Sequence, residues 1–378
     1  MIKRYLFESI KNDLGKKLVF ISGPRQSGKT TLSKMFENKC NYLNFDNDDD
    51  RRIILKKRWD RSSDLLILDE LHKMNKWKGW LKGVYDVEGM HPPIIVTGSS
   101  KLDTYRKVGD SLAGRFFSYR LHPLDIKEIM KYLPEISSKD ALERLFATGP
   151  FPEPFLNGTQ EYYRRWRKGY QDIIIKQDLI TLENVRNITG IENLLLLMRE
   201  RVGATCSYTN IARDLEVDPK TVMKWLDILE RLFIVFKVTP YSKKIRDSLL
   251  KAPKYYFYDT AMVSGDSGTK LENLVACALL KELHYLEDTK GLDINLHYIR
   301  NKRGEEIDFC VLIDRMPKLL CEVKWSDDNF AKAFNSYAKY FPNIKKVQLV
   351  ANLPREITLD RLSEIRNAAT WLGDFQLM

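Results

Sequence analysis

The sequence predicts an α/β protein of three domains. At 378 residues, the chain is longer than one hydrophobic core usually supports. Near the N-terminus, an apolar run leads directly into a glycine-rich loop and a helical pattern, and the last third alternates helical patterns with apolar strands. The region between them is mainly helical in its periodicity. We place the domains at residues 1–135, 136–252 and 253–378.

The composition indicates which kind of partner the protein binds and in which compartment it is found. Lys and Arg outnumber Asp and Glu by 62 to 51, a formal net charge of +11, which favours a polyanionic partner such as nucleic acid. No apolar run has the length of a bilayer span, and the opening MIKRYLFESIKNDLGKK lacks the apolar stretch of a secretory signal. The five cysteines form no C-x-x-C pair, so neither a disulfide framework nor a zinc site is predicted. We expect a cytoplasmic protein that does not contact the membrane.

The strongest motif is the stretch LVFISGPRQSGKTTLSKMF. Leu18 to Ser22 predict a strand, and GPRQSGKT matches the G-x-x-x-x-G-K-[ST] pattern of a P-loop. The glycines allow backbone N–H groups to surround a phosphate at the start of the following helix. Lys29 would reach the β- and γ-phosphates of ATP, and Thr30 would bind Mg²⁺. The nucleotide-binding residues predicted from this loop are Gly23, Pro24, Arg25, Gln26, Ser27, Gly28, Lys29 and Thr30.

A second strand supplies the acids that a P-loop requires. In DLLILDE, four apolar residues precede Asp69 and Glu70. Asp69 would hold the magnesium through water, and Glu70 would orient or deprotonate the attacking water. An apolar run that ends in acids is common at any buried strand, but the P-loop favours the catalytic interpretation.

A third strand and a following arginine complete the N-terminal pattern. PPIIVTGSS ends in hydroxyl residues, of which Thr97 or Ser99 would contact the γ-phosphate or the water. LAGRFFSYRLHPL places Arg115 just before another strand. In this order, the motifs resemble the Walker A, Walker B, sensor 1 and arginine-finger elements of the AAA+ ATPases. The resemblance implies that Arg115 reaches the nucleotide of an adjacent subunit in a homo-oligomer; the alternative is a surface arginine paired with an acid such as Asp110.

Helical periodicity dominates from about residue 125 to residue 203. The segment GPFPEPFL interrupts it with three prolines, which predict a stiff turn. YYRRWRK interleaves aromatic residues with cations. This pattern fits a groove that binds nucleic acid and fits equally well a lid helix with a solvated basic face.

SYTNIARDLEVDPKTVMKWLDILERLFIV predicts a helix-turn-helix, with Pro219 in the first turn of the second helix. LFIVFKVTPY predicts a β-strand that would form part of a wing. Exposed side chains of the second helix, Lys220, Thr221 and Lys224, would face a major groove if this element binds DNA. A purely structural role is the alternative. The predicted small core consists of Ile211, Leu215, Val222, Leu226 and Leu229.

The last third predicts a helix that begins near Glu272, antiparallel strands, a second helix and a further strand. EEIDFCVLID and KLLCEVKW are separated by a tight turn. If Arg315 and Met316 form a two-residue loop, Asp308 faces Val323, and an error of one residue still leaves Asp308 beside Glu322 or Lys324 on the same face. Carboxylates at that spacing suit a divalent cation, which would offset their mutual repulsion.

The arrangement of Asp308, Glu322 and Lys324 resembles the active site of the PD-(D/E)xK nucleases, which have a restriction-endonuclease-like fold. The resemblance implies that Asp308 and Glu322 bind Mg²⁺ and that Lys324 positions or activates the attacking water. Glu272 matches the acid that many of these nucleases place on a helix beside the metal. Ile307 stands where the signature has proline, which is a departure from the pattern.

The order of these motifs through most of the chain resembles archaeal and bacterial AAA+ ATPases fused to a C-terminal nuclease-like domain of undefined role. The implied fold is α/β: a P-loop AAA+ domain, a helical and winged-helix middle domain and a restriction-endonuclease-like α/β domain. The implied function is ATP hydrolysis coupled to Mg²⁺-dependent cleavage of DNA. The alternative is a nucleotide-gated switch whose C-terminal domain binds nucleic acid or a protein without cleavage. A small-molecule kinase is disfavoured because its lid needs neither a winged helix nor the residues beyond it.

Overall fold

The computed structural model describes residues 2–99, 112–173, 179, 187–242, 252–301 and 303–378. The chain divides into two compact units, the first comprising Met1–Pro123 and Arg231–Phe233 and the second comprising Leu124–Glu230 and Ile234–Met378. Among the helices of the described part, none combines the length and the apolar character that crossing a bilayer requires.

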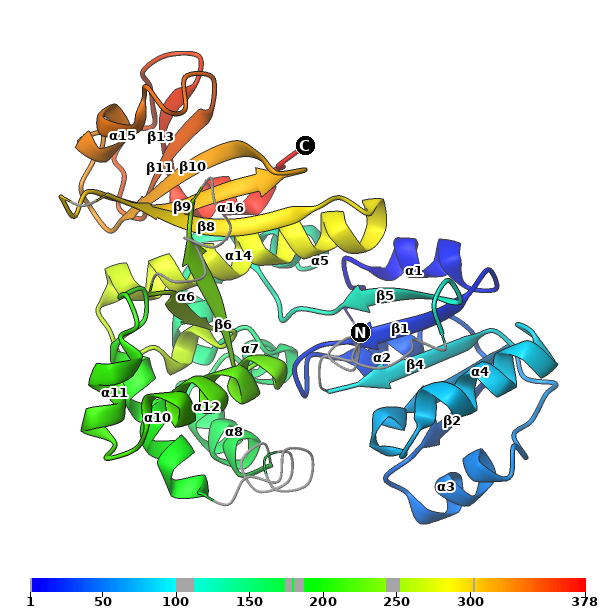
Figure 1. The fold of residues 1–378 in the computed structure, drawn as a ribbon. Helices are drawn as coiled ribbons and strands as arrows, with labels where there is room; N and C mark the ends of the chain where they lie inside the picture. The colour runs from blue at the N-terminus through cyan, green and yellow to red at the C-terminus, as the bar shows by residue number, and fades with distance from the viewer. Residues whose placement is uncertain (1, 100–111, 174–178, 180–186, 243–251, 302) are drawn as a thin grey trace. The chain divides into compact units, whose positions relative to one another are not determined.

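The first unit contains a parallel sheet of five strands in the order β2-β3-β4-β1-β5 (Figure 1). Its strands are β1 (Leu18–Ser22), β2 (Cys40–Asn44), β3 (Leu65–Asp69), β4 (Ile94–Gly98) and β5 (Phe116–Arg120). Its helices are α1 (Phe7–Asp13), α2 (Lys29–Ser33), α3 (Asp48–Leu55), α4 (Trp77–Glu88) and the 3₁₀ helix η1 (Leu71–Lys73). Because β4 lies between β1 and β3, the ends of all three strands meet at one edge of the sheet.

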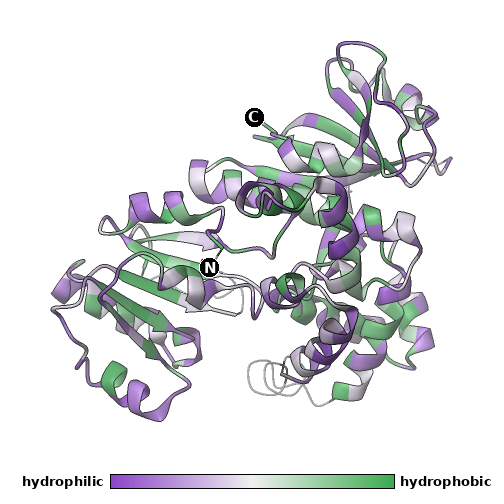
Figure 2. Ribbon diagram, turned by 180° about the vertical axis from the view of Figure 1, so that it is seen from behind, coloured by the Kyte–Doolittle hydropathy of each residue, from purple (hydrophilic) through white to green (hydrophobic). Residues whose placement is uncertain are grey.

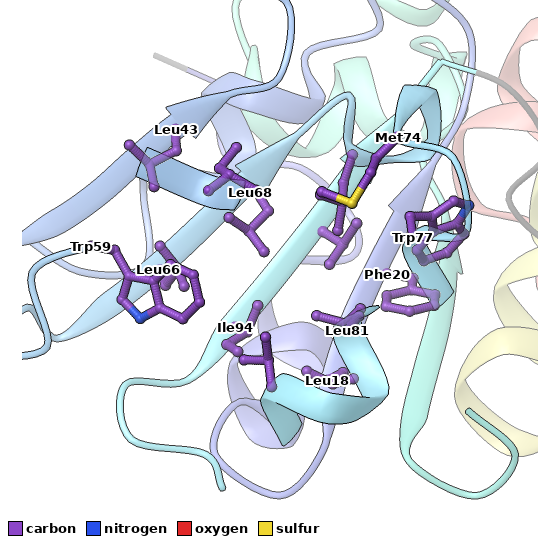
Figure 3. Close-up of a cluster of buried hydrophobic side chains, with 14 of the residues drawn as sticks. Leu18, Phe20, Leu43, Trp59, Leu66, Leu68, Met74, Trp77, Leu81 and Ile94 are labelled. Carbon is purple, nitrogen blue, oxygen red and sulfur yellow. The ribbon is translucent and has the colours of Figure 1, made fainter. Parts of the chain in front are cut away.

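A continuous apolar core holds α4 against this sheet (Figure 3). Phe20 of β1 packs on Trp77 of α4 with ring centroids 5.6 Å apart, and Leu81 of the same helix is fully buried. The strands β1, β3 and β4 are buried at every position, so they are apolar along most of their length (Figure 2). Continuous burial of this kind is characteristic of a parallel sheet. The core therefore fixes the strand ends from which the candidate site is built.

The second unit begins with helices and continues into a mixed sheet. Its helices before the sheet are α5 (Ile126–Tyr132), α6 (Ser138–Thr148), α7 (Pro152–Asn157), α8 (Gln160–Ile173), α10 (Ile188–Glu200), α11 (Tyr208–Asp214) and α12 (Pro219–Arg231). On α8, which carries YYRRWRK, Tyr163 and Trp166 are buried while Arg164 and Arg165 are exposed. Trp166 stacks on Tyr170 with ring centroids 4.7 Å apart. Tyr163 and Trp166 therefore belong to the core, whereas Arg164 and Arg165 lie on an exposed basic face.

The segment predicted as a helix-turn-helix contains two helices, α11 and α12. Of the five residues predicted to close its core, Leu215 is half-buried and the other four are buried. Lys220 and Lys224 are exposed as predicted, but Thr221 is half-buried. The following strands β6 (Val235–Pro240) and β7 (Lys254–Phe257) pair in antiparallel fashion, as the two strands of a wing would.

An eight-stranded sheet extends through the second unit in the order β12-β13-β11-β10-β9-β8-β6-β7. β6 joins it through a parallel pair with β8, in which Thr239 lies opposite His297. The remaining strands are β8 (Ile294–Arg300), β9 (Glu306–Ile313), β10 (Met316–Lys324), β11 (Lys345–Val350), β12 (Ile357–Thr358) and β13 (Ser363–Asn367). The other helices are η4 (Thr260–Met262), α14 (Ser267–Lys290), α15 (Lys332–Tyr337) and α16 (Ala368–Asp374).

The turn between β9 and β10 differs from the prediction. The loop residues are Asp314 and Arg315, with φ of 49° and 63°, and Met316 already pairs with Ile313. Two consecutive residues with positive φ match the twist of a tight hairpin. A bulge between Pro317 and Leu319 then shifts the register by one residue. The predicted loop of Arg315 and Met316 is therefore wrong.

The register of the acids differs as a result. Cys321 lies opposite Phe309, so one step further along the ladder Asp308 faces Glu322 and not Val323. The predicted pairing of Asp308 with Val323 is wrong by one residue. In the observed register the two acids lie on the same face of the sheet, whereas the predicted register would have put Glu322 on the opposite face.

Candidate functional site

The loop between β1 and α2 has a backbone that only glycine permits at two of its positions. Gly23 has φ of 152°, and a Cβ there would lie 2.3 Å from the carbonyl oxygen of Leu121. Gly28, which precedes α2, has φ of 93°. Gln26 also adopts positive φ, at 59°, without being a glycine. The loop is therefore held in the curled backbone that a phosphate cradle requires.

Lys29, the first residue of α2, is buried beside this loop. Its Nζ donates hydrogen bonds to the carbonyl oxygens of Gly23 (3.0 Å) and Pro24 (2.7 Å), so its ammonium lies against the loop that would receive the phosphates. Arg4, which the sequence analysis did not single out, donates to the carbonyl oxygens of Ser27 and His122. Arg4 therefore joins the phosphate loop to the segment that follows β5. Its partners lie 23 and 118 positions away in the sequence, so no local motif marks it.

Asp69 is the centre of the polar contacts at the end of β3. Its carboxylate accepts hydrogen bonds from the hydroxyl groups of Thr30 (2.8 Å), Tyr42 (2.8 Å) and Thr97. The parallel pairing places Asn44, Asp69 and Thr97 in line across three strands. The hydroxyl of Thr30 and the carboxylate of Asp69 are hard oxygen donors of the kind that Mg²⁺ prefers, so these residues fit the ion that the P-loop implies.

Tyr42 was missed because its role depends on the pairing of β2 with β3. Burial, followed by the charge of Asp69 and the hydrogen bond to it, raises the pKa of the Tyr42 phenol above its ordinary value. The phenol is therefore a permanent donor to Asp69 at physiological pH.

Glu70 lies immediately beyond β3 in a left-handed backbone conformation with φ of 56°. A non-glycine residue at positive φ is held there by its surroundings and is frequent at functional sites. Burial raises the pKa of its carboxyl group, while the nearby charges of Lys29 and Lys73 act in the opposite direction. Ser99 Oγ lies 3.3 Å from Glu70 Oε2, so the end of β4 contacts this acid. The role of Glu70 as the group that orients or deprotonates the attacking water stays a prediction.

His72 of η1 adjoins Glu70 and is a further residue that the motifs did not indicate. Its side chain is fully buried, and Nε2 lies 3.7 Å from Glu70 Oε2. Neither ring nitrogen has a hydrogen-bond partner among the described residues. Burial, reinforced by the charges of Lys73 and Lys29, lowers the pKa of His72 to about 4. The imidazole is therefore neutral at physiological pH.

Arg115 makes an ion pair within its own chain. Its Nε lies 3.0 Å from Asp86 Oδ1 of α4, and its guanidinium lies 5.9 Å from the ring centroid of Tyr85. Asp110, the partner considered from the sequence, lies outside the described residues. In the single chain, Arg115 thus has the character of a surface arginine paired with an acid.

The acids and the lysine predicted in the last third converge on one place in the second unit. Asp308 Oδ2 accepts a hydrogen bond of 2.9 Å from the backbone N–H of Val323, and the N–H of Asp308 lies 3.4 Å from Glu322 Oε2. Lys324 Nζ forms an ion pair of 2.8 Å with Glu322 Oε1. Glu272 of α14 adds its charge to this group, since it contributes to raising the pKa of both Asp308 and Glu322. Glu306, two residues before Asp308 on β9, lies beside the same lysine, Lys254, as Asp308 does. We call Glu272, Glu306, Asp308 and Glu322 the acid cluster.

The acid cluster carries more negative charge than its surroundings offset. Burial, followed by the charges of Glu272 and Glu322, raises the pKa of Asp308 well above its ordinary value. Burial also raises the pKa of Glu322, although Lys324 partly opposes the shift. Carboxyl groups that are buried together in this way would be stabilised by a cation.

The acid cluster has the oxygen ligands that a divalent metal ion prefers, but not three ligands arranged around one position. Asp308 and Glu322 offer hard oxygen donors from adjacent strands, which fits magnesium. Glu272 instead accepts a hydrogen bond of 2.7 Å from the hydroxyl of Tyr256. Within the described ranges, no three acidic, cysteine or histidine side chains are arranged to hold one ion together. The fit therefore rests on two carboxylates, with the third acid engaged elsewhere.

Sequence reasoning missed Glu306 and also missed Lys254, which lies among the acids of the cluster. Its ammonium is 2% exposed and lies 2.5 Å from Glu306, 3.3 Å from Glu272 and 3.9 Å from Asp308. Burial alone would lower its pKa, but the charges of Glu272, Asp308 and Glu306 raise the pKa of Lys254 above its ordinary value. A lysine inside the apolar run APKYYFYDT is the only local signal, and it does not reveal which acids will surround it.

Family models match three successive parts of the chain. Residues 15–130 match an AAA domain, residues 139–271 match a domain of unknown function (DUF8612), and residues 267–362 match another domain of unknown function (DUF4143).

Curated relatives align along most of the chain. An uncharacterized protein of Mycobacterium tuberculosis is 26% identical over 310 residues, which cover 79% of this chain and 68% of the relative. An uncharacterized protein of Methanocaldococcus jannaschii is 23% identical over 363 residues, which cover 87% of this chain and 80% of the relative. These similarities extend beyond the P-loop part.

Among solved structures, the chain is similar to the RuvB Holliday junction branch migration motor of Thermotoga maritima, with 16% identity and a TM-score of 0.33 over 63% of this chain and 90% of that one. It is also similar to a signal transduction ATPase with numerous domains from Pyrococcus horikoshii, with 14% identity and a TM-score of 0.23 over 75% of this chain and 47% of that one. Scores this low add nothing to the assignment. The family match to residues 15–130 and the P-loop geometry together support an N-terminal domain of the AAA+ ATPase type.

Proposed function

We propose that this protein hydrolyses ATP to act on DNA and that its C-terminal domain cleaves DNA with a divalent metal ion. The observation that carries the cleavage half is the convergence of Asp308, Glu322 and Lys324 on the adjacent strands β9 and β10, with Glu272 close by. The PD-(D/E)xK pattern of the sequence predicts that these residues meet.

The ATPase half rests on the contacts at the ends of β1, β3 and β4. Lys29 would exchange its two loop carbonyls for phosphate oxygens, and Thr30 with Asp69 would hold Mg²⁺. Glu70 would orient or deprotonate the attacking water, and Thr97 or Ser99 would contact the γ-phosphate or that water. Arg115 would leave Asp86 to reach the nucleotide of a neighbouring subunit in a homo-oligomer.

In the C-terminal domain, Asp308 and Glu322 would hold the ion, which when bound polarises the scissile phosphate and lowers the pKa of a water molecule. Lys324 is 37% exposed, so its amine is accessible to solvent and would orient a water or a phosphate oxygen. Glu272 would complete the site from α14 after releasing its present partners.

DNA would be held by basic surfaces of the second unit. Lys220 and Lys224 on α12 are exposed, as are Arg164 and Arg165 on α8. The formal net charge of +11 favours association with a polyanion and predicts that binding weakens as salt increases.

A panel of linear, branched and single-stranded DNA, incubated with Mg²⁺ with and without ATP, tests the proposal. Asp308→Ala should abolish cleavage and leave ATP hydrolysis nearly intact, whereas Lys29→Ala should abolish ATP hydrolysis. If Asp308→Ala changes neither activity, or if the unaltered protein cleaves none of these substrates, the nuclease proposal is rejected.

A second candidate is a nucleotide-gated switch whose C-terminal domain binds nucleic acid or a protein without cleaving it. The observation that favours it is Lys254, whose ammonium already lies among three of the acids. Very slow ATP turnover, with nucleotide retained at nanomolar affinity and no cleavage of any DNA, would support this candidate. Rapid Mg²⁺-dependent cleavage would exclude it.

A further inference from the structure

Lys254 is a buried cation that the proposed reaction does not use. It begins β7, where its backbone pairs with Val238 of β6 and forms a bridge with Thr205. From β7 its side chain reaches the carboxylates of β9 and α14, and the residue is only 2% exposed. A buried ammonium is stable only when carboxylates surround it.

Three carboxylates from two elements supply this surrounding. Glu306 and Asp308 lie two positions apart on β9 and therefore point to the same face of the sheet, and Glu272 reaches them from α14. Tyr256, two residues after Lys254 on β7, donates to the same Glu272 oxygen that faces the ammonium. Lys254 and Tyr256 thus both bind the carboxylate of Glu272 and fix its position.

The charges of the cluster do not cancel. Its four carboxylates face two buried or half-buried ammonium groups, Lys254 and Lys324, which leaves a formal excess of two negative charges. Arg300 also contacts Glu306 at 3.5 Å, but its side chain is 45% exposed and is screened by solvent. The excess is of the size that one divalent cation would neutralise, while Lys254 already lies against two of the acids that such an ion would use.

We propose that Lys254 sets the divalent-cation affinity of the Asp308–Glu322 site, by holding Glu272 and opposing a second cation beside Asp308. This inference rests on the proposed metal site of the C-terminal domain. Two cations that share one carboxylate repel each other, so the ion binds only at the expense of the Lys254 contacts. The protein then requires a high concentration of metal, or a movement of β7, before the third acid becomes available.

The test is calorimetric titration of the nucleotide-free full-length chain with Mn²⁺, which reports binding without requiring any activity. Lys254→Met should bind the ion at least about tenfold more tightly than the unaltered protein, because one positive charge near 4 Å is removed. Lys254→Arg keeps the charge and should remain close to the unaltered protein. Equal or weaker binding by Lys254→Met would overturn the proposal, as would the absence of binding in every variant.

Because Lys254→Met leaves buried carboxylates unpaired, the paired variant Lys254→Met with Glu306→Gln provides a second route that removes cation and acid together. It too should bind Mn²⁺ more tightly than the unaltered protein, and failure of both variants to do so counts against the proposal. The matched control is Lys281→Met with Glu128→Gln, which removes another buried ion pair of 2.6 Å, between α14 and α5. The control should leave the Mn²⁺ affinity unchanged, and a tenfold gain in it would overturn the assignment to Lys254.

The two proposals fail in different ways. Tighter Mn²⁺ binding by Lys254→Met without cleavage of any DNA would reject the nuclease and keep the role of Lys254. Mg²⁺-dependent cleavage of DNA together with unchanged Mn²⁺ affinity in the Lys254 variants would keep the nuclease proposal and reject the role of Lys254.

Discussion

Thr30 donates a hydrogen bond of 2.8 Å to Asp69, and this contact joins the helix after the P-loop to the end of β3. The two residues are 39 positions apart in the sequence. An ion held between a hydroxyl and a carboxylate would occupy the position that this hydrogen bond marks.

Thr30 therefore provides the first prediction. Thr30→Ala removes the hydroxyl and should lower the rate of Mg²⁺-dependent ATP hydrolysis by about 10²-fold or more, because the ion loses a direct ligand. Thr30→Ser keeps the hydroxyl and should retain most of the rate. Steady-state phosphate release measures both, and equal rates for the alanine and serine variants would contradict the assignment.

Glu70 provides the second prediction. Glu70→Gln preserves the size of the side chain but removes the base, so ATP hydrolysis should fall by about 10²- to 10⁴-fold while ATP still binds. Equilibrium binding of ATP and single-turnover hydrolysis separate these effects. Loss of binding, with hydrolysis of bound ATP unchanged, would show that Glu70 has a structural role only.

His72 predicts a pH dependence of stability. Its pKa is lowered from 6.5 to about 4 in the folded chain, so the unfolded chain binds the additional proton between these values. The stabilisation is present above about pH 6.5 and is lost as the pH falls to about 4, and it amounts to the order of 3 kcal/mol. The groups whose charges act on His72 are Lys73, Lys29, Arg25 and Asp46, with Glu70 also close by.

Urea unfolding at a series of pH values measures this effect as the difference between the unaltered protein and His72→Gln. The variant should lose less unfolding free energy than the unaltered protein between pH 6.5 and pH 4. His91→Gln alters an exposed histidine and should follow the unaltered protein. Parallel curves for His72→Gln and the unaltered protein would contradict the prediction.

Arg115 distinguishes a monomeric from an oligomeric ATPase. If Arg115 acts on a neighbouring subunit, Arg115→Ala should reduce ATP hydrolysis and spare ATP affinity. Mixing it with Lys29→Ala protein should then restore part of the activity, because one subunit supplies the arginine and the other the intact nucleotide site. An absence of recovery on mixing would support the intrachain pair with Asp86 as the main role of Arg115.

The sequence predicts the site residues best where they belong to one short, contiguous motif. The phosphate loop and the acids at the end of β3 follow from short contiguous motifs. The PD-(D/E)xK pattern predicts the meeting of Asp308 with Glu322, but the hairpin register predicted from the sequence would have placed the two side chains on opposite faces of the sheet. The turn was harder to predict, because Asp314 and Arg315 adopt positive φ without the usual Asn-Gly signature and a bulge then shifts the register.

Residues that act over long sequence distances were not predictable. Tyr42 reaches Asp69 only because β2 pairs with β3, and Arg4 reaches the P-loop from the N-terminal segment. Lys254 enters the acid cluster because β7 pairs with β6 while Glu272 approaches on α14. These positions depend on tertiary pairing, which one sequence does not specify.

The most direct test of the central claim is a double-mutant comparison of DNA cleavage in Mg²⁺ with Asp308→Asn, Glu322→Gln and the two combined. Because one ion would be held by both carboxylates, each single change should reduce the rate by about 10²-fold or more, and the double change should reduce it little further. ATP hydrolysis should stay within about twofold of the unaltered protein in all three variants. Losses that multiply in the double variant, or cleavage that survives both single changes, would contradict the account.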